Sequence, residues 1–253
     1  MSQSPEISDD FNSRKRKRGN ESSSKKRKRT RPSQEEIYED VDESKHLNLA
    51  FAKLDPNLLA DHVAKKQRRF DSDATNLELE ERRLPASAIL DTTQWTETRT
   101  LDKLPAFLRS IVKDDLKKVP ANPGSPHTVV IAGAGLRAAD ITRALREFQT
   151  SDGKVAKLFA KHIKLSESIE MLKKTRITIG VGTPSRLAAL LDDGALNPER
   201  IARIIVDASH IDKKKRGILD MKETLVPLLD LLNRDEFRSR PLRDQDQVDL
   251  VFY

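Results

Sequence analysis

The hydrophobic and polar positions of this 253-residue chain fall into three regions of different character. Residues 1–44 carry almost no apolar periodicity, whereas residues 45–125 contain short helical spacings separated by prolines. Residues 126–253 alternate compact apolar runs with amphipathic stretches. A segment with little apolar surface cannot offset its loss of conformational entropy on folding. We therefore expect a disordered tail, then helical and extended arms that order against partners, then a compact domain.

The stretch around residues 176–212 predicts the fold of the compact domain. Ile177–Val181 is a β-branched run typical of a buried strand, and Thr183 and Pro184 then suit the start of a helix. Leucines at helical spacing continue to Gly194, and the apolar run 203–206 predicts another strand. Strand, helix and strand in this order predict an α/β domain, with a parallel sheet and helices on both faces.

The loops that follow these two strands are the expected ligand-binding edge. In open parallel sheets, ligands bind outside the carboxyl ends of the strands. Residues 183–186 and 207–210 follow the two predicted strands directly. We therefore expect ligand-binding residues in these two loops.

Residues 45–125, the predicted arms, contain fewer patterns that indicate secondary structure. Helical spacing in residues 46–70 breaks near Pro56, where a second helix should begin, and residues 101–116 again have helical spacing. Residues 84–95 look extended, and prolines around Gly124 mark a linker before the compact domain. The run Lys65–Arg69 reads as a solvated helix face that a phosphate backbone could also use.

Composition narrows the classes of protein. The chain has no cysteine, which excludes disulfides and thiolate metal sites and fits a reducing intracellular compartment. Apolar runs stay well short of the ~18 residues of a membrane span, so we expect no membrane partner. The net charge of +7 is spread along the chain and permits a polyanionic partner without demanding one.

Two basic blocks lie within the predicted tail. Such runs are typical of nuclear import signals or of patches that bind polyanions, and two blocks close together favour import. An acidic run at residues 35–43 follows them. The first block is Arg14, Lys15, Arg16, Lys17 and Arg18, and the second is Lys25, Lys26, Arg27, Lys28 and Arg29.

Four motifs together resemble the CMS family, helicase-like proteins of the small-subunit processome, the early pre-ribosomal particle. They are GAGLRAADITRAL, IGVGTPSRL, IVDASHID and KKKRGILDMKET, all within residues 128–253. GTPSRL also looks like the TPGR motif of DEAD-box RNA helicases, and IIVDASHID looks like their DEAD strand and loop. The resemblance implies a single RecA-like helicase lobe, a nuclear and nucleolar location, and pre-ribosomal RNA and processome proteins as partners.

The resemblance also implies residues that contact RNA phosphates. In the helicases, the loop and helix start aligned with Gly135 and Arg137 grip a phosphate, and backbone N–H groups there can bind anions whatever the side chains. Thr183 and Arg186 keep the phosphate-contacting types, with Ser185 where the helicases have glycine. An N-cap role for Thr183 and a surface position for Arg186 explain the same residues equally well. A further candidate is the basic cluster Lys213, Lys214, Lys215 and Arg216.

The groups that hydrolyse nucleotides in such a domain are missing. A phosphate-binding loop ending in Gly-Lys-Ser/Thr should precede residue 128, yet residues 80–127 contain no Gly-Lys pair. Asp207 matches the first residue of the DEAD motif, but Ala208 replaces the glutamate that orients the attacking water. Ser209 and His210 complete a degenerate motif. The sequence therefore predicts a protein that is not an enzyme and has no cofactor, metal or small-molecule substrate.

Other functions compete with this interpretation. Gly133, Gly135 and Ala138 match a dinucleotide-binding fingerprint, which would suit an NAD(P)-dependent oxidoreductase. However, no acid follows the strand predicted at residues 155–159, although Lys161 could hold a ribose phosphate. An unorthodox ATPase and a pure protein-interaction module also remain open. Asp207, Ser209 and His210 are too close in sequence to converge as a catalytic triad, and the histidines lack the spacing of a helical zinc site.

We therefore expect a non-catalytic assembly factor or scaffold of the small-subunit processome. It should bind pre-ribosomal RNA and processome proteins through residues 126–253, with the arms at 45–125 binding partners and the tail at 1–44 directing nuclear import.

Overall fold

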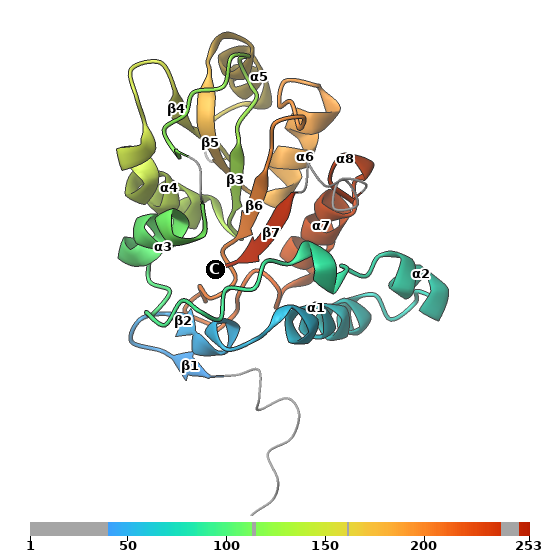
Figure 1. The fold of residues 1–253 in the computed structure, drawn as a ribbon. Coiled ribbons are helices and arrows are strands. Elements are labelled where there is room, and N and C mark those ends of the chain that lie inside the picture. Colours follow the sequence, from blue (N-terminus) through green and yellow to red (C-terminus); the bar gives the residue numbers. More distant parts are fainter. Residues whose placement is uncertain (1–39, 113–114, 161, 239–247) are drawn as a thin grey trace, which may run out of the picture. The chain divides into compact units, whose positions relative to one another are not determined.

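The computed structural model describes residues 40–112, 115–160, 162–238 and 248–253 (Figure 1). The two basic blocks predicted to direct nuclear import lie outside these residues, as does Lys161.

Five parallel strands form the central sheet, in the order β4-β5-β3-β6-β7. In the register of the sheet, Ile131 lies opposite Gly182 on one side and Val206 on the other. All four strand pairings are parallel, as the strand-helix-strand pattern predicted. The strands are β3 (Thr128–Ile131), β4 (Lys154–Leu158), β5 (Ile177–Gly182), β6 (Arg203–Val206) and β7 (Asp249–Phe252).

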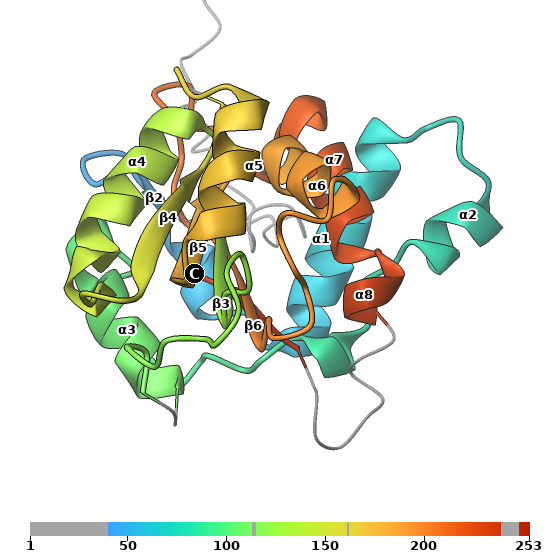
Figure 2. The ribbon, with the colours of Figure 1, turned by 90° about the horizontal axis from the view of Figure 1, so that it is seen from above.

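Helices cover both faces of this sheet, which confirms the predicted α/β class (Figure 2). One face packs against α3 (Leu104–Ile111) and α4 (Gly135–Ala144). The other packs against α1 (Pro56–Phe70), α6 (Pro184–Asp192) and α7 (Lys222–Leu232). The remaining α-helices are α2 (Asn76–Glu81), α5 (Leu165–Lys174) and α8 (Asp235–Arg238), and the short 3-10 helices are η2 (Leu49–Ala52), η3 (Ala86–Ala88), η4 (Leu101–Lys103) and η5 (Leu145–Phe148).

Local sequence explains where several helices begin and end. The Asp55 carboxylate accepts hydrogen bonds from the Asn57 and Leu58 N–H groups at the start of α1, where Pro56 takes the first position. Beyond α6, Gly194 has a φ of +77°, a conformation that favours glycine. These boundaries agree with the sequence predictions. Pro227 lies inside α7, and the helix runs through it.

Glycine at position 182 allows three elements to approach closely. A Cβ atom there would overlap the carbonyl oxygen of Leu158 in β4 and lie 2.8 Å from Cγ of Leu187 in α6. Position 182 therefore requires glycine. The start of α6 can then pack directly against the end of β5.

Most elements of residues 45–112 pack against the chain's own sheet, whereas α2 has no buried residue. The short strand β2 (Leu47–Asn48) pairs with β1 (Val41–Asp42), and η2 and α1 then contribute buried side chains to the same hydrophobic cluster as the sheet. Ile89 forms a parallel bridge with Leu250 at the edge of the sheet. The sequence predicts arms that order against partners, whereas their apolar residues are buried within the chain. The predicted domain boundaries themselves stay a prediction.

The buried residue Arg99 links residues 92–100 to the last strand, β7. The Arg99 guanidinium donates to the carbonyl oxygen of Phe252 and to the Thr92 hydroxyl, the latter at 2.8 Å. Burial lowers its pKa to about 10, while the nearby Tyr253 acts in the opposite direction. The Tyr253 hydroxyl in turn donates to the carbonyl oxygen of Thr100, 2.7 Å away. These bonds hold residues 92–100 across the end of β7.

In the part of the chain that the structure describes, no helix is long and apolar enough to cross a membrane.

Candidate functional site at the carboxyl edge of the sheet

The predicted binding loops meet at the carboxyl edge of the sheet. Because β3 lies between β5 and β6, the loop that leads into α4 lies between the loop before α6 and the loop after β6. The structure therefore brings together the surroundings of Gly135, Thr183 and Asp207, which lie far apart in the sequence. This convergence agrees with the expectation from parallel-sheet topology.

Arg137 and Asp207 form a paired contact at the centre of this edge. The Arg137 Nε and Nη2 groups donate to the two carboxylate oxygens of Asp207, at 2.8 and 2.9 Å. The side chains are only 12% and 4% exposed, respectively. A fork of this kind satisfies both carboxylate oxygens at once. The charge of the Asp207 carboxylate is therefore matched by the guanidinium of Arg137.

The next two residues of the degenerate motif are buried. Ala208 is 1% exposed and belongs to the hydrophobic cluster that contains α1, α6 and α7. Ser209 is 2% exposed, and its hydroxyl has no hydrogen-bond partner among the described residues. Both backbone N–H groups donate to the carbonyl oxygen of Tyr253, at 2.8 and 2.7 Å. The loop is thus tied to the end of β7, and Ser209 does not pair with Asp207, whose carboxylate faces Arg137.

Residues 46–48 form backbone hydrogen bonds with the same loop, at residues 209–211. Leu47 and His210 form an antiparallel bridge, the Asn48 N–H donates to the carbonyl oxygen of Ser209 at 2.7 Å, and the Ile211 N–H donates to that of His46 at 3.0 Å. His210 is half-buried, and its pKa is lowered first by burial and then by the charge of Arg137. This pairing could not be predicted from the hydrophobic pattern, because the strand there, Leu47–Asn48, is only two residues long.

Arg186, the second arginine considered as a phosphate contact, also forms hydrogen bonds within the chain. The Arg186 guanidinium donates to the Ser168 hydroxyl in α5 at 3.1 Å and to the carbonyl oxygen of Ile163 at 3.0 Å. It therefore holds the segment before α5 against α6. Arg186 is partly buried. Ser185 beside it is exposed.

Thr183 occupies the N-cap position of α6, but its hydroxyl makes no capping hydrogen bond. Ala134 is the N-cap residue of α4 and likewise provides no side-chain cap, so Gly135 begins that helix. Neither helix start therefore has a side-chain cap, although in α6 Pro184 has no N–H group and the Arg186 N–H donates to the carbonyl oxygen of Thr183 at 3.1 Å. Free N–H groups at a helix start favour anions.

The glycine-rich loop between β3 and α4 packs against its own chain. A Cβ atom at Gly133 would lie 3.4 Å from Cβ of Ile218. That distance is an ordinary van der Waals contact, so packing alone does not require glycine at position 133. Of the three fingerprint residues Gly133, Gly135 and Ala138, only Ala138 is buried in the core, where α4 packs on the sheet.

The basic cluster at residues 213–216 forms an exposed turn. Lys215 has a φ of 60° and its ammonium lies 2.6 Å from a Glu43 carboxylate oxygen. Arg216 pairs with Asp212 at 2.8 Å, and hydrogen bonds from Arg216 are the largest cause that lowers the Asp212 pKa to about 2. Lys213 and Lys214 are exposed, and the described residues give neither ammonium an ion-pair partner.

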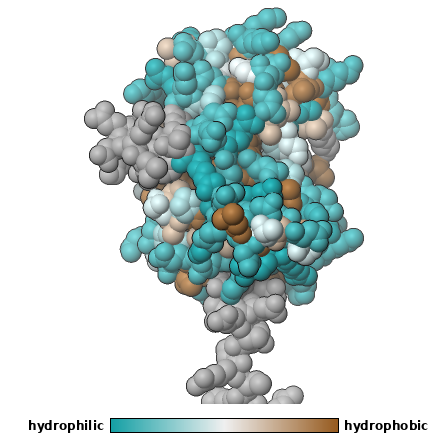
Figure 3. All heavy atoms as spheres, turned by 90° about the vertical axis from the view of Figure 1, so that its right-hand side faces the viewer, coloured by the Kyte–Doolittle hydropathy of each residue, from teal (hydrophilic) through white to brown (hydrophobic). Residues whose placement is uncertain are grey.

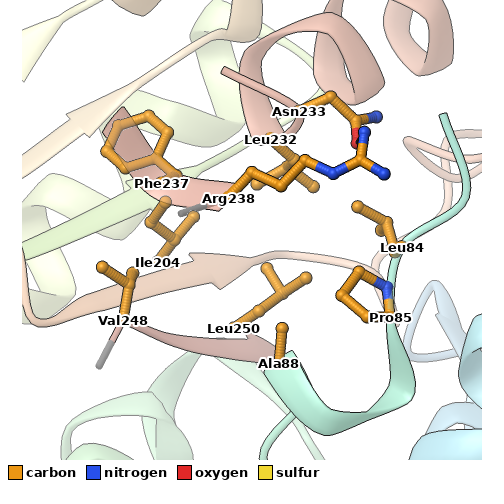
Figure 4. A pocket seen from close by; sticks show the side chains of 10 residues that line it. All are labelled: Leu84, Pro85, Ala88, Ile204, Leu232, Asn233, Phe237, Arg238, Val248 and Leu250. Atoms are coloured by element: carbon orange, nitrogen blue, oxygen red, sulfur yellow. Dashed lines mark hydrogen bonds between the residues drawn. The ribbon is translucent and has the colours of Figure 1, made fainter. Parts of the chain in front are cut away.

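The close-up in Figure 4 shows a pocket between η3, β6, β7, α7 and α8. Its volume is about 30 Å³, the scale of a single water molecule rather than of a nucleotide. Most of its lining is apolar, with Ile204 and Leu250 from the sheet, Val248 just before β7, and Leu232 and Phe237 from the helices. It is a packing gap and not a binding site for a polar ligand.

Metal binding finds no support in the described ranges, which contain no group of three or more histidine, aspartate or glutamate side chains suitably placed for an ion.

Comparison with known proteins decides the family. A family model described as a U3-containing 90S pre-ribosomal complex subunit, CMS1, matches residues 8–253. The chain belongs to the CMS1 family. Membership confirms the resemblance found in the sequence motifs and gives this CMS1-family chain a role in ribosome assembly.

Relatives of this CMS1-family chain extend from fungi to vertebrates. Protein CMS1 of Chaetomium thermophilum is 47% identical over 250 residues, which cover 98% of this chain and 99% of the relative. Protein cms1 of Schizosaccharomyces pombe is 34% identical, covering 70% of this chain and 63% of its own length. Human protein CMSS1 is 31% identical, covering 73% and 64%. Among solved structures, a DEAD box protein from the hyperthermophile Methanococcus jannaschii is 14% identical, covering 62% of this chain and 37% of its own, with a TM-score of 0.37.

Proposed function

We propose that this CMS1-family protein is a non-catalytic assembly factor of the small-subunit processome. It acts by binding, as a scaffold that contacts pre-ribosomal RNA and processome proteins through the sheet-based domain. The nucleus and nucleolus are its place of action, reached through the basic blocks at residues 14–18 and 25–29.

The pairing of Arg137 with Asp207 is the observation that carries the non-catalytic part. A hydrolytic centre needs a carboxylate open to a metal ion and a second group that orients water. Asp207 is instead covered by a guanidinium that already satisfies both of its oxygens. Position 208 is an alanine inside a hydrophobic cluster, so no carboxylate stands beside it. The local chemistry supports a permanently closed site.

The proposed RNA contacts rest on two features of the same edge. The start of α4 has no side-chain cap, the exposed Ser185 lies in the first turn of α6, and the turn at residues 213–216 presents Lys213 and Lys214. Backbone N–H groups and lysine ammonium groups are typical ligands of RNA phosphates and do not depend on base sequence. Arg137 and Arg186 act indirectly in this proposal, because each holds a loop in place through internal hydrogen bonds.

Calorimetry on the full chain tests the non-catalytic part. We expect no saturable heat on titration with ATP and Mg²⁺, with NAD⁺ or with NADP⁺, and no nucleotide turnover above that of Asp207→Ala. Saturable binding of a nucleotide that is lost in Gly135→Val would overturn the proposal and favour a nucleotide-dependent enzyme.

RNA crosslinking in intact pre-ribosomal particles tests the binding part. We expect crosslinks at Ser185 and at Lys213 or Lys214, and reduced RNA recovery with the variant Lys213→Gln/Lys214→Gln. The variant Lys117→Gln/Lys118→Gln is the matched control, because it removes the same charge from two other exposed lysines. Particle association without any RNA crosslink at these positions would identify a module that binds only proteins.

A further inference from the structure

A groove runs along one side of α1, beside α2. It consists of two hollows of about 290 and 440 Å³, which share the side chains of Asp61, Glu80 and Arg83 and therefore meet there. The first hollow extends to Arg68 near the end of α1, and the second extends to Asn57 near its start. Eleven positions separate these two residues, which is about 16 Å along the helix axis. An extended peptide of about five residues spans that distance.

The wall opposite α1 is a short helix that is fixed at both ends. At the start of α2, the Thr75 hydroxyl and the Glu78 carboxylate form a reciprocal capping box. Directly after α2, Arg82 pairs with Asp71 at 3.0 Å, and its carbonyl oxygen accepts a hydrogen bond from the Asn233 side chain at 2.8 Å. Helix α2 itself has no buried residue. The groove is therefore shaped by hydrogen bonds and ion pairs and is not closed by apolar packing.

Gln67, which lines the first hollow, has a buried amide nitrogen without an acceptor. The residue is 4% exposed, and no described residue accepts a hydrogen bond from its Nε2 group. Gln67 also lines a gap of about 10 Å³ between α1 and α7, which is at the lower limit of the space that one water needs. A buried donor without a partner destabilises the folded chain. An acceptor larger than water can reach this amide only from the first hollow.

The charges that line the first hollow leave a cation without a partner. Arg83 pairs with both acidic residues, at 2.5 Å from Asp61 and 3.5 Å from Glu80. Arg68 is exposed, and the described residues give it no ion-pair partner. A position in the last turn of a helix favours a cation and accounts for Arg68, but it does not account for the unpaired Gln67 amide beside it. A guanidinium and an amide therefore line one hollow without an internal acceptor.

The same hollow suits a peptide better than a nucleic acid backbone. A sugar-phosphate backbone carries a continuous row of negative charges, which the half-exposed carboxylates of Asp61 and Glu80 repel. A peptide offers N–H donors to those carboxylates and an acidic side chain to Gln67 and Arg68. Figure 3, which views the side of the molecule on which α2 lies, shows a mainly hydrophilic surface with scattered apolar positions, as a polar groove requires.

We propose that this groove binds an extended acidic segment of a partner protein, with one carboxylate held by the Arg68 guanidinium and the Gln67 amide. A carboxylate accepts through two oxygens and can satisfy both donors at once. A small rotation of the Gln67 side chain turns its amide toward the ligand. The inference rests on the proposed function, because it names the place where one protein of the particle contacts the chain. It does not depend on an RNA contact at residues 213–216.

Nuclear magnetic resonance on the full chain tests the groove at a single site. The basic blocks at residues 14–18 and 25–29 also attract acidic peptides, so the readout has to be local. The probe is a capped pentaglutamate, and the reporter is the side-chain amide resonance of Gln67, assigned by its absence from Gln67→Leu. We expect this resonance to shift on titration, with a dissociation constant about twofold to fivefold higher in Arg68→Gln. The matched control Arg146→Gln removes the same charge from another exposed arginine and should leave the constant unchanged.

Carbodiimide coupling gives a second readout. It joins a carboxylate to a nearby lysine amine without a spacer, and the exposed Lys65 lines the same hollow. Mass spectrometry should find pentaglutamate on Lys65, and Gln67→Leu should reduce that yield about tenfold relative to coupling at the lysines of the basic blocks. Leucine fills a similar space without an unpaired amide, so this variant should melt at the same temperature as the unmodified chain or higher.

Each outcome decides between two explanations. A Gln67 resonance that pentaglutamate does not move, or binding that Gln67→Leu and Arg68→Gln leave unchanged, would overturn the groove. A shift caused by oligouridylate but not by pentaglutamate would assign the hollow to RNA and refute the peptide. A lower melting temperature of Gln67→Leu would show that the amide is satisfied within the chain. In all these cases RNA crosslinks at residues 213 and 214 would leave the proposed function standing, whereas peptide binding without those crosslinks would keep the groove and remove the RNA part.

Discussion

The ion pair between Arg137 and Asp207 allows a strong prediction about stability. Substitution of Arg137 by methionine keeps most of the side-chain volume but leaves the Asp207 carboxylate, 4% exposed, without its partner. Removal of one member of a buried ion pair typically costs about 3–5 kcal/mol, because the remaining charge is left uncompensated. For a chain of this size, that corresponds to a fall in melting temperature of about 6–20 °C.

The double variant Arg137→Met/Asp207→Asn is the decisive comparison. It removes the buried charge as well, so it should recover at least 1 kcal/mol relative to Arg137→Met. Urea unfolding, followed by circular dichroism, measures the free energies of unfolding for the four proteins of this cycle. A loss below about 1 kcal/mol in Arg137→Met, or no coupling between the two sites, would refute the view of a closed, internally compensated centre. Neither variant should gain nucleotide binding, because position 208 still lacks a carboxylate.

Three further predictions concern the scaffold around this centre. The depressed pKa of His62, about 4 against 6.5, means that the unfolded state takes up a proton first on acidification, so stability should fall between pH 6.5 and pH 4. The contribution is about 2 kcal/mol by pH 5, and denaturation of His62→Gln should show a shallower dependence over that window. Gly182→Ala should cost about 1–3 kcal/mol or more through overlap with the Leu158 carbonyl, whereas Gly194→Asn, at a left-handed position with open space around it, should unfold at nearly the same urea concentration as the parent. Phe107→Ala should cost about 3–5 kcal/mol, because Phe107 is fully buried between Trp95 and Tyr253, and a calorimetric melting shift of only 1–2 °C would contradict this.

The elements of the sheet were predictable because their chemistry is local. Apolar runs that end at glycine or aspartate predicted strands. Proline after a capping residue predicted the starts of α1 and α6. The meeting of three loops at one edge followed from parallel topology alone. What periodicity could not reveal was which side chains would pair across that edge.

The candidate arginines illustrate this limit. In the sequence, Arg137 and Arg186 both stand at the third position of a helix that follows a strand, where a phosphate contact is reasonable. Their actual acceptors, Asp207 and the carbonyl of Ile163, lie on other segments. Hydrogen bonds between residues so far apart in the sequence depend on how the whole chain packs. Only the structure could therefore show that these arginines bond within the chain and are not available to a phosphate.

The bridges between early and late parts of the chain also have a consequence for synthesis. Residues 46–48 pair with residues 209–211, and Ile89 pairs with Leu250. Contacts so distant in sequence slow folding, since long loops must close before any of them forms. A chain emerging from the ribosome must therefore hold the apolar faces of its first helices uncovered until its final strand has been made, and it then needs protection from aggregation.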